Sequence, residues 1–202
     1  AKGKYIKPKK INNRNVNINF NGQDNDINAA FKLIKKSSKP IFYTGGGVIN
    51  SGPRATELLR ELVSLTGFPI TSTLQGLGAY PGTDPQFLGM LGMHGTYEAN
   101  NAMHDCDLMI NIGARFDDRI TGKIDEFSPK SKKIHIDIDP SSINKNVNVD
   151  LPIVGDVKFV LKKLISSIRE KYPNFVDQEA LSREYLEHKE TEISRKELFF
   201  HL

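Results

Sequence analysis

The chain has 202 residues, of which 38% are hydrophobic and 26% are charged, a composition typical of a globular domain with a sizeable core. Its net charge of +4 comes from the first 14 residues, which hold six basic residues and no acid. Because the rest of the chain is nearly neutral, the composition argues against a protein that binds the phosphate backbone of nucleic acid. We interpret the basic arm as a solvated linker. No apolar run reaches the ~18–20 residues of a membrane span, and the N-terminus shows no apolar stretch or cleavage site, so we expect neither a membrane span nor a secretory signal. The single cysteine, Cys106, excludes an internal disulfide and is typical of a reducing compartment.

The first half of the chain alternates between helical and extended patterns. Residues 1–25 are rich in asparagine, lysine and glycine and predict a linker arm. From residue 27, apolar residues recur at i, i+3, i+4 and i+7, which predicts a helix with Asp26 as its N-cap. Residues 40–44 predict a buried strand that ends in three glycines, and Pro53 opens a second helix that ends near Gly67.

The second half repeats this alternation. Further strands are predicted at 68–73, 107–113, 132–139 and 149–156, and further helices at 96–105 and from Asp156, whose side chain can cap the helix. This order is typical of a doubly wound α/β fold, in which a parallel sheet of about six strands has helices on both faces. We therefore expect one α/β domain over 26–172, followed by a helical linker over 173–202.

Glycines and charges collect directly after the predicted strands. The carboxyl ends of parallel strands meet at one edge of a sheet, where ligands bind, so these segments are candidates for one site: TGGGVINSG, LQGLGAYPG, ARFDDRITG, DPSS and GD. Backbone N–H groups of glycines suit phosphate oxygens, although one glycine-rich turn alone is more often an ordinary turn. The dinucleotide fingerprint is incomplete, because Gly45-x-Gly47 is followed by Asn50 instead of a third glycine, and the phosphate-loop pattern is absent.

The segment ARFDDRITG places two aspartates, Asp117 and Asp118, between Arg115 and Arg119. Carboxylates beside arginines are expected to form ion pairs with them, which favours positioning of an anion over proton transfer. The sequence therefore predicts an anion site at this strand end.

Other catalytic patterns are absent. No histidine lies in an H-E-x-x-H motif or pairs with cysteines at zinc spacing, so we expect no metal site, and there is no Gly-x-Ser-x-Gly elbow. Cys106 precedes a strand and is expected to be a packing residue. Met90 and Met93 are interpreted as core residues in preference to contacts with a planar ligand.

Three segments carry a resemblance to a known family. They are TLQGLGAYPG (73–82), the stretch from LGMLGMHGTYEAN to GARFDDRITG (88–122), and HIDIDPSSINKNVNVDLPIVGD (135–156). Over about 27–170 and in the same order, they resemble the central domain of acetolactate synthase, also called acetohydroxyacid synthase. Pyruvate oxidase, benzoylformate decarboxylase and glyoxylate carboligase share the fold but resemble these segments less well.

The resemblance implies a function for the whole enzyme. The family condenses two pyruvates, or pyruvate and 2-ketobutyrate, to 2-acetolactate or 2-aceto-2-hydroxybutyrate plus CO2, in branched-chain amino acid biosynthesis. It implies thiamine diphosphate and Mg2+ in two other domains and FAD, without a redox role in the overall reaction, in the middle domain. Gly155-Asp156 continues with Val157 instead of the glycine of the family's Mg2+ segment, and no Asn-Asn pair follows. We therefore expect no catalytic residue in this chain and no activity from it alone.

The resemblance also implies contacts with FAD at the following residues: Gly45, Gly46, Gly47, Thr73, Leu74, Leu91, Met93, His94, Gly95, Thr96, Gly113, Arg115, Asp117, Arg119, Ile120, Asp137, Ile138, Asp156 and Val157. It places Leu74 on the flavin side, Arg115 at the diphosphate and ribityl region, and Asp137 at the adenosine part. Met93, Asp118 and Arg119 are implied to reach the substrate channel, where Arg119 orients the carboxylate of the incoming 2-keto acid.

The resemblance further implies partners and a compartment. The partners are the other domains of the subunit, a second catalytic subunit in a homodimer, a small regulatory subunit and the keto-acid substrate, without nucleic acid or membrane. The compartment is the cytoplasm of a bacterium, or a plastid or mitochondrion of a eukaryote.

Two other functions stay open from the sequence. The chain could be the central domain of another thiamine-diphosphate-dependent decarboxylase or oxidase, although the GARFDDRITG block argues against this. It could also be a nucleotide-binding module without an enzymatic role, in which case side chains would fill the edge of the sheet and leave no groove.

Overall fold

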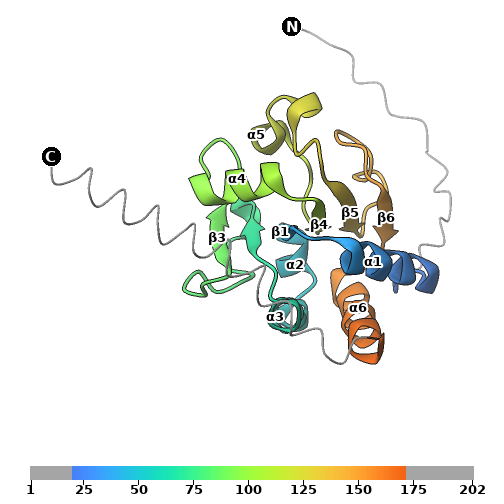
Figure 1. The fold of residues 1–202 in the computed structure, drawn as a ribbon. Coiled ribbons are helices and arrows are strands. Elements are labelled where there is room, and N and C mark those ends of the chain that lie inside the picture. Colours follow the sequence, from blue (N-terminus) through green and yellow to red (C-terminus); the bar gives the residue numbers. More distant parts are fainter. Residues whose placement is uncertain (1–19, 172–202) are drawn as a thin grey trace, which may run out of the picture.

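The apolar runs of the sequence form the strands of one sheet. In the computed structural model, which describes residues 20–171, the strands are β1 (Pro40–Thr44), β2 (Ile70–Ser72), β3 (Phe87–Met90), β4 (Leu108–Ile112), β5 (Lys132–Asp137) and β6 (Leu151–Val154). Neighbouring strands all pair in parallel, in the order β3-β2-β1-β4-β5-β6 (Figure 1). The predicted parallel sheet of six strands is therefore confirmed.

Helices cover both faces of this sheet, as the doubly wound prediction requires. On one face lie α1 (Asp24–Lys36), α3 (Pro53–Thr66) and α6 (Val157–Lys171), and on the other lies α4 (Tyr97–Asp105) (Figure 1). The loops also contain two short helices, α2 (Gly46–Asn50) and α5 (Asp118–Thr121), and two 3-10 turns, η1 (Leu74–Gly76) and η2 (Ile124–Glu126).

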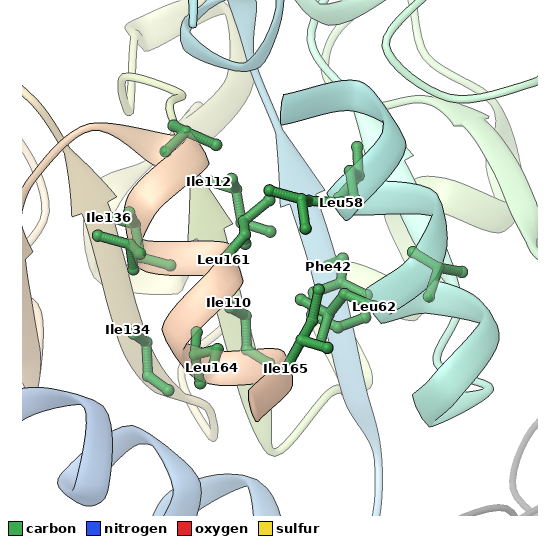
Figure 2. Packing of buried hydrophobic residues seen from close by; sticks show 14 of the residues in the cluster. Phe42, Leu58, Leu62, Ile110, Ile112, Ile134, Ile136, Leu161, Leu164 and Ile165 are labelled. Atoms are coloured by element: carbon green, nitrogen blue, oxygen red, sulfur yellow. The ribbon is translucent and has the colours of Figure 1, made fainter. Parts of the chain in front are cut away.

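Alternation along each strand divides the buried side chains between two cores. On β1, Phe42 joins the core shared with α1, α3 and α6, whereas Ile41 and Tyr43 join the core shared with α4. Every residue of β1 and β4 is buried, because helices cover both faces of the central strands. Figure 2 shows side chains of α3 and α6 over the sheet: Leu58, Leu62, Leu161, Leu164 and Ile165 lie near Phe42, Ile110, Ile112, Ile134 and Ile136.

One helix start differs from its prediction and another confirms it. Helix α1 begins at Asp24, so the prediction of Asp26 as N-cap is wrong. The backbone carbonyl of Gln23 accepts hydrogen bonds from the amides of Asp26 and Ile27, both at 3.1 Å, which places Asp26 inside the first turn beside the positive end of the helix dipole. At α6 the predicted cap is present, since Asp156 Oδ1 accepts a hydrogen bond from the Lys158 amide at 2.9 Å.

The ends of the domain can be compared with the predicted linkers only in part. The helical connector predicted over 173–202 and residues 1–19 of the predicted arm lie outside the described residues. Phe20 and Gly22 contact the start and middle of α6, because the Phe20 carbonyl accepts from the Asp156 amide at 2.8 Å and the Gly22 carbonyl accepts from Lys163 Nζ at 3.1 Å. Across residues 20–171, no helix combines the length and apolar character that a membrane span requires.

Candidate functional site

The strand order reverses between β1 and β4, and a groove of about 1150 Å³ lies at the carboxyl edge of the sheet around this point. Open parallel sheets bind ligands at such a switch point. The groove extends from the segment after β2 to the segment after β6, and its lining residues are Gly46, Gly47, Ile49, Asn50, Ser51, Thr73, Leu74, Gln75, Gly113, Ala114, Arg115, Asp117, Asp118, Arg119, Ile120, Asp137, Ile138, Ser142, Asp156 and Val157. The edge of the sheet is therefore open, which argues against the module with a filled edge.

Most of the candidate site residues meet in this groove, although they come from five different strand ends. Those that line it are Gly46, Gly47, Thr73, Leu74, Gly113, Arg115, Asp117, Asp118, Arg119, Ile120, Asp137, Ile138, Asp156 and Val157. Those outside its lining are Gly45, Leu91, Met93, His94, Gly95 and Thr96. The structure thus assembles the strand-end candidates, apart from Gly45, and leaves outside the lining the candidates of the loop between β3 and α4.

The loop between β3 and α4 nevertheless adjoins α5. The Met93 amide donates a hydrogen bond to the Arg119 carbonyl at 3.0 Å, so these two candidates are neighbours. The side chain of Met93 is exposed, with 60% of its surface accessible, and the interpretation of Met93 as a core residue is wrong. It follows Gly92, whose φ of +109° turns the chain out of the sheet, whereas Leu91 before it is buried in the core that contains α4.

Several residues of the groove lie in the candidate strand-end segments but were not among the FAD contacts that the resemblance implies: Ile49, Asn50, Ser51, Gln75, Ala114 and Ser142. Ser51 is the clearest case, because its Oγ donates to Asp156 Oδ1 and accepts from the Lys158 amide at 3.1 Å, which joins the end of α2 to the start of α6. Its partners lie more than a hundred residues away in the sequence. The only local signal is the position of Ser51 just after the glycine-rich turn.

The glycines after β1 and β4 pack against one another. The Gly47 amide donates to the Gly113 carbonyl at 2.9 Å, and a methyl group on Gly47 would lie only 2.7 Å from Gly113 Cα. Gly113 has a φ of +62°, in the left-handed region. A methyl group on Gly46 would instead meet Gln75 Cβ at an acceptable 3.4 Å. Gly47 and Gly113 are therefore needed for backbone packing at the switch point, while Gly46, which borders the groove, leaves room for a methyl group in contact with Gln75.

The two arginines of the groove have different surroundings. Arg115 Nη2 lies 3.2 Å from Asp117 Oδ2, in an exposed ion pair. Arg119 is exposed, and within residues 20–171 no carboxylate lies within 4 Å of its guanidinium group. Asp118 Oδ1 instead accepts a hydrogen bond from the Arg119 amide at 2.9 Å. The expected pairing is thus confirmed for Arg115 and wrong for Arg119, whose side chain is available to an anion.

Acidic side chains near β5 and β6 are held by backbone amides and, at Asp156, by a hydroxyl group as well. Asp137 Oδ1 accepts from the Asp139 amide at 2.8 Å, and Asp156 is held by Ser51 and Lys158 as described above. Exposed apolar side chains lie along the same groove, with 66% of Leu74, 43% of Ile49 and 47% of Ile138 accessible. The groove therefore combines apolar contact surface, guanidinium groups and carboxylate acceptors.

Cys106 and Lys133 lie at the amino ends of β4 and β5, on the sheet edge opposite the groove. Burial raises the pKa of the Cys106 thiol to about 11, and the thiol packs in the core as predicted. Burial also lowers the pKa of Lys133, whose Nζ donates to the carbonyls of Ser128 and Ser131 at 2.9 and 3.1 Å. Among the described residues, no group of three histidine, cysteine or acidic side chains could hold a metal ion.

Comparison with known proteins adds sequence relationships to this geometry. Residues 27–164 match the family model described as "Thiamine pyrophosphate enzyme, central domain". The chain is 48% identical to the acetolactate synthase large subunit of Haemophilus influenzae over 167 aligned residues. These aligned residues make up 83% of this chain and 29% of that protein. The chain is 49% identical to acetolactate synthase of Mycobacterium leprae (82% and 26% covered) and 41% identical to the acetolactate synthase isozyme 3 large subunit of Escherichia coli (83% and 29% covered). The chain spans less than a third of the length of these relatives.

Proposed function

Because the chain belongs to the family of thiamine pyrophosphate enzyme central domains, we propose that it is the central domain of an acetolactate synthase large subunit. The names of the most similar relatives support this assignment. The whole enzyme would condense two pyruvates, or pyruvate and 2-ketobutyrate, with loss of CO2. Thiamine diphosphate and Mg2+ would be held by other domains, and a second catalytic subunit and a small regulatory subunit would be its partners.

We propose further that this domain binds FAD in the groove, and the observation that carries the proposal is the length of the groove. It reaches from β2 to β6, and four strand spacings of about 4.8 Å give a span of roughly 19 Å. Its volume of about 1150 Å³ slightly exceeds the ~300–1,000 Å³ that is typical of ligand pockets. Such a groove suits an extended dinucleotide better than a compact metabolite.

The chemistry of the lining residues fits the parts of this cofactor. Arg115 lies beside the switch point and would neutralise the diphosphate, with the backbone of Gly46 close by. Asp137 would accept hydrogen bonds from ribose hydroxyls. The exposed apolar side chain of Leu74 would contact the flavin ring.

Arg119 and Met93 would link the cofactor site to the substrate. They are exposed neighbours on one rim, and the free guanidinium of Arg119 suits the carboxylate of a 2-keto acid. Bound FAD supplies flavin redox chemistry, which the net condensation does not require. The proposed role of this domain is therefore positional: it holds the cofactor and presents Arg119 and Met93 to a neighbouring active site.

The test is a titration of the purified 202-residue chain with FAD, followed by flavin fluorescence. We expect saturable binding of FAD. Riboflavin, which lacks the diphosphate, should bind at least about tenfold more weakly, because roughly one charge-assisted contact is lost. Arg115→Met should weaken FAD binding, whereas the control Arg54→Met should not, because Arg54 is similarly exposed and ion-paired with Glu57 but lies on α3. Failure to bind FAD at any concentration would contradict the cofactor assignment.

The catalytic proposal has a separate test. Supplied with pyruvate, thiamine diphosphate, Mg2+ and FAD, the 202-residue chain should form no acetolactate, because the proposed catalytic groups belong to other domains. Formation of acetolactate by this chain alone would contradict the assignment as a central domain.

A further inference from the structure

The turn that carries Arg115 is fixed through three consecutive backbone carbonyls. The Ala114 carbonyl accepts two hydrogen bonds, from Asn111 Nδ2 at 2.8 Å and His135 Nε2 at 3.0 Å. The Arg115 carbonyl accepts from the Tyr43 hydroxyl at 3.3 Å, and the Phe116 carbonyl accepts from Asn146 Nδ2 at 2.6 Å. We call Tyr43, Asn111, His135 and Asn146 the carbonyl clamp.

The donors of the carbonyl clamp come from three adjacent strands and a loop. Tyr43 lies on β1, Asn111 on β4 and His135 on β5, and the three side chains are fully buried. Asn111 also accepts the Ala114 amide at 3.0 Å, so it holds both polar groups of that residue. The strands are therefore joined beneath the turn by side chains as well as by the sheet.

The shortest polar contact of His135 is the one with the Ala114 carbonyl at 3.0 Å, and the same Nε2 lies 3.7 Å from Asp137 Oδ2. A carbonyl only accepts hydrogen bonds, so the bond to Ala114 requires a proton on Nε2. Nδ1 is buried and has no hydrogen-bond partner among the described residues. Such buried polar atoms are rare, because leaving one without a partner lowers the free energy of unfolding. The ring also packs edge-on against Phe116, with 5.2 Å between the ring centroids. Among the described residues, Nδ1 of His135 is therefore unsatisfied, while Nε2 holds the turn.

The hydroxyl of Tyr43 keeps the proton that it donates to the Arg115 carbonyl. Burial, and to a smaller extent the nearby charge of Asp117, raises the pKa of its hydroxyl well above the ordinary value. The ring of Tyr43 packs on Phe116 at 5.9 Å between centroids. Phe116 therefore anchors the turn in the core, while the residues on either side of it, Arg115 and Asp117, face the groove.

We propose that the carbonyl clamp is a set of positioning residues that pre-organises Arg115 for the diphosphate of a bound dinucleotide, an inference that rests on the FAD binding proposed above. None of its four members lines the groove. They act on Arg115 through the backbone: because three of its carbonyls are already fixed, the turn loses little conformational entropy when a ligand binds.

The test compares three variants of the 202-residue chain. His135→Met keeps the apolar bulk and removes the donor, and His135→Gln restores an N–H donor at a similar distance from the backbone. Ile134→Val is the matched control, because it removes a methylene group from a buried neighbour on the same strand that belongs to the core of the opposite face. Each variant is measured for its FAD Kd and for amide hydrogen exchange at residues 114–118, at a temperature where it is folded.

We expect His135→Met to raise the FAD Kd about tenfold, the equivalent of one hydrogen bond of ~1.4 kcal/mol, and to speed exchange in the turn. His135→Gln should recover most of both effects, and Ile134→Val should lower stability without changing either. Equal Kd values and exchange rates for His135→Met and the wild type would overturn the proposal.

Two further outcomes separate this inference from the proposal on which it rests. If the wild type does not bind FAD, the cofactor assignment fails, and exchange at residues 114–118 alone decides whether the clamp fixes the turn. If His135→Met does not fold, Tyr43→Phe decides, since it removes only a hydroxyl group. Faster exchange at residues 115–117 and a higher FAD Kd in Tyr43→Phe support the clamp, and unchanged values refute it.

Discussion

The contact between Gly47 and Gly113 makes a sharp prediction about stability. Replacing Gly47 with alanine places a methyl carbon 2.7 Å from Gly113 Cα and 2.9 Å from the Gly113 carbonyl oxygen. Because carbon atoms normally approach to about 3.5 Å, the two turns must separate by roughly 0.8 Å. Both atoms are backbone, so no side chain can rotate away, and the overpacking should cost about 1–3 kcal/mol.

Gly46→Ala is the matched control for this variant. Both glycines lie in α2, so the gain of about 0.5–1 kcal/mol from restricting the unfolded chain cancels when the two variants are compared. A methyl group on Gly46 meets Gln75 Cβ at 3.4 Å, which needs almost no movement. For a domain of this size, the difference corresponds to a melting temperature roughly 2–12 °C lower for Gly47→Ala than for Gly46→Ala.

The assay is thermal unfolding followed by circular dichroism, with the free energy of unfolding confirmed by urea denaturation. Equal melting temperatures for the two alanine variants would refute the reasoning, because they would mean that the turns after β1 and β4 are not in backbone contact. A lower value for Gly46→Ala than for Gly47→Ala would refute it more strongly.

Three further predictions concern the core, a helix cap and the buried thiol. Leu161→Ala should lower the free energy of unfolding by about 2–5 kcal/mol in urea denaturation, because this side chain of α6 is fully buried in the core against the sheet. The exposed control Lys162→Ala, on the same helix, should change it by less than about 0.5 kcal/mol. Asp156→Ala should cost about 1 kcal/mol and Asp156→Asn much less, since only asparagine keeps an acceptor for the Lys158 amide, and equal losses would contradict the cap. Burial raises the pKa of the Cys106 thiol from an ordinary 9.0 to about 11 in the folded protein. The contribution of the neutral thiol to the free energy of unfolding, about 2–3 kcal/mol, is therefore complete below about pH 9 and is lost as the pH rises toward 11. If the free energy of unfolding depended on pH in the same way in the wild type and in Cys106→Ala, this prediction would be contradicted.

The central elements of the fold were predictable because their burial is complete. Strands such as β1 and β4 are covered on both faces, so that their sequences are short apolar runs. Helix α3 was predicted from Pro53 at its start and from the apolar stripe that follows. β3, α2 and α5 have no counterpart among the predicted elements. β3 is a four-residue edge strand with an irregular register against β2, α2 begins with two glycines, and neither leaves a periodic pattern.

The site was predictable to the extent that it depends on topology. The carboxyl ends of parallel strands must share an edge, so candidates such as Arg115 and Asp137 could be brought together without coordinates. Contacts that depend on particular side-chain directions could not. The hydrogen bond from His135 to Ala114 arises from the register of β4 with β5. The lack of a carboxylate near the Arg119 guanidinium, within residues 20–171, arises from the start of α5 at Asp118. No local pattern in the sequence encodes them.

The most direct test of the account is amide hydrogen exchange of the 202-residue chain with and without FAD. We predict that the cofactor slows exchange along the carboxyl edge of the sheet, at 46–51, 113–120 and 137–138, and leaves the opposite edge around Lys133 unchanged. Protection around Lys133, or saturable FAD binding without protection at 113–120, would contradict the placement of the cofactor at the switch point.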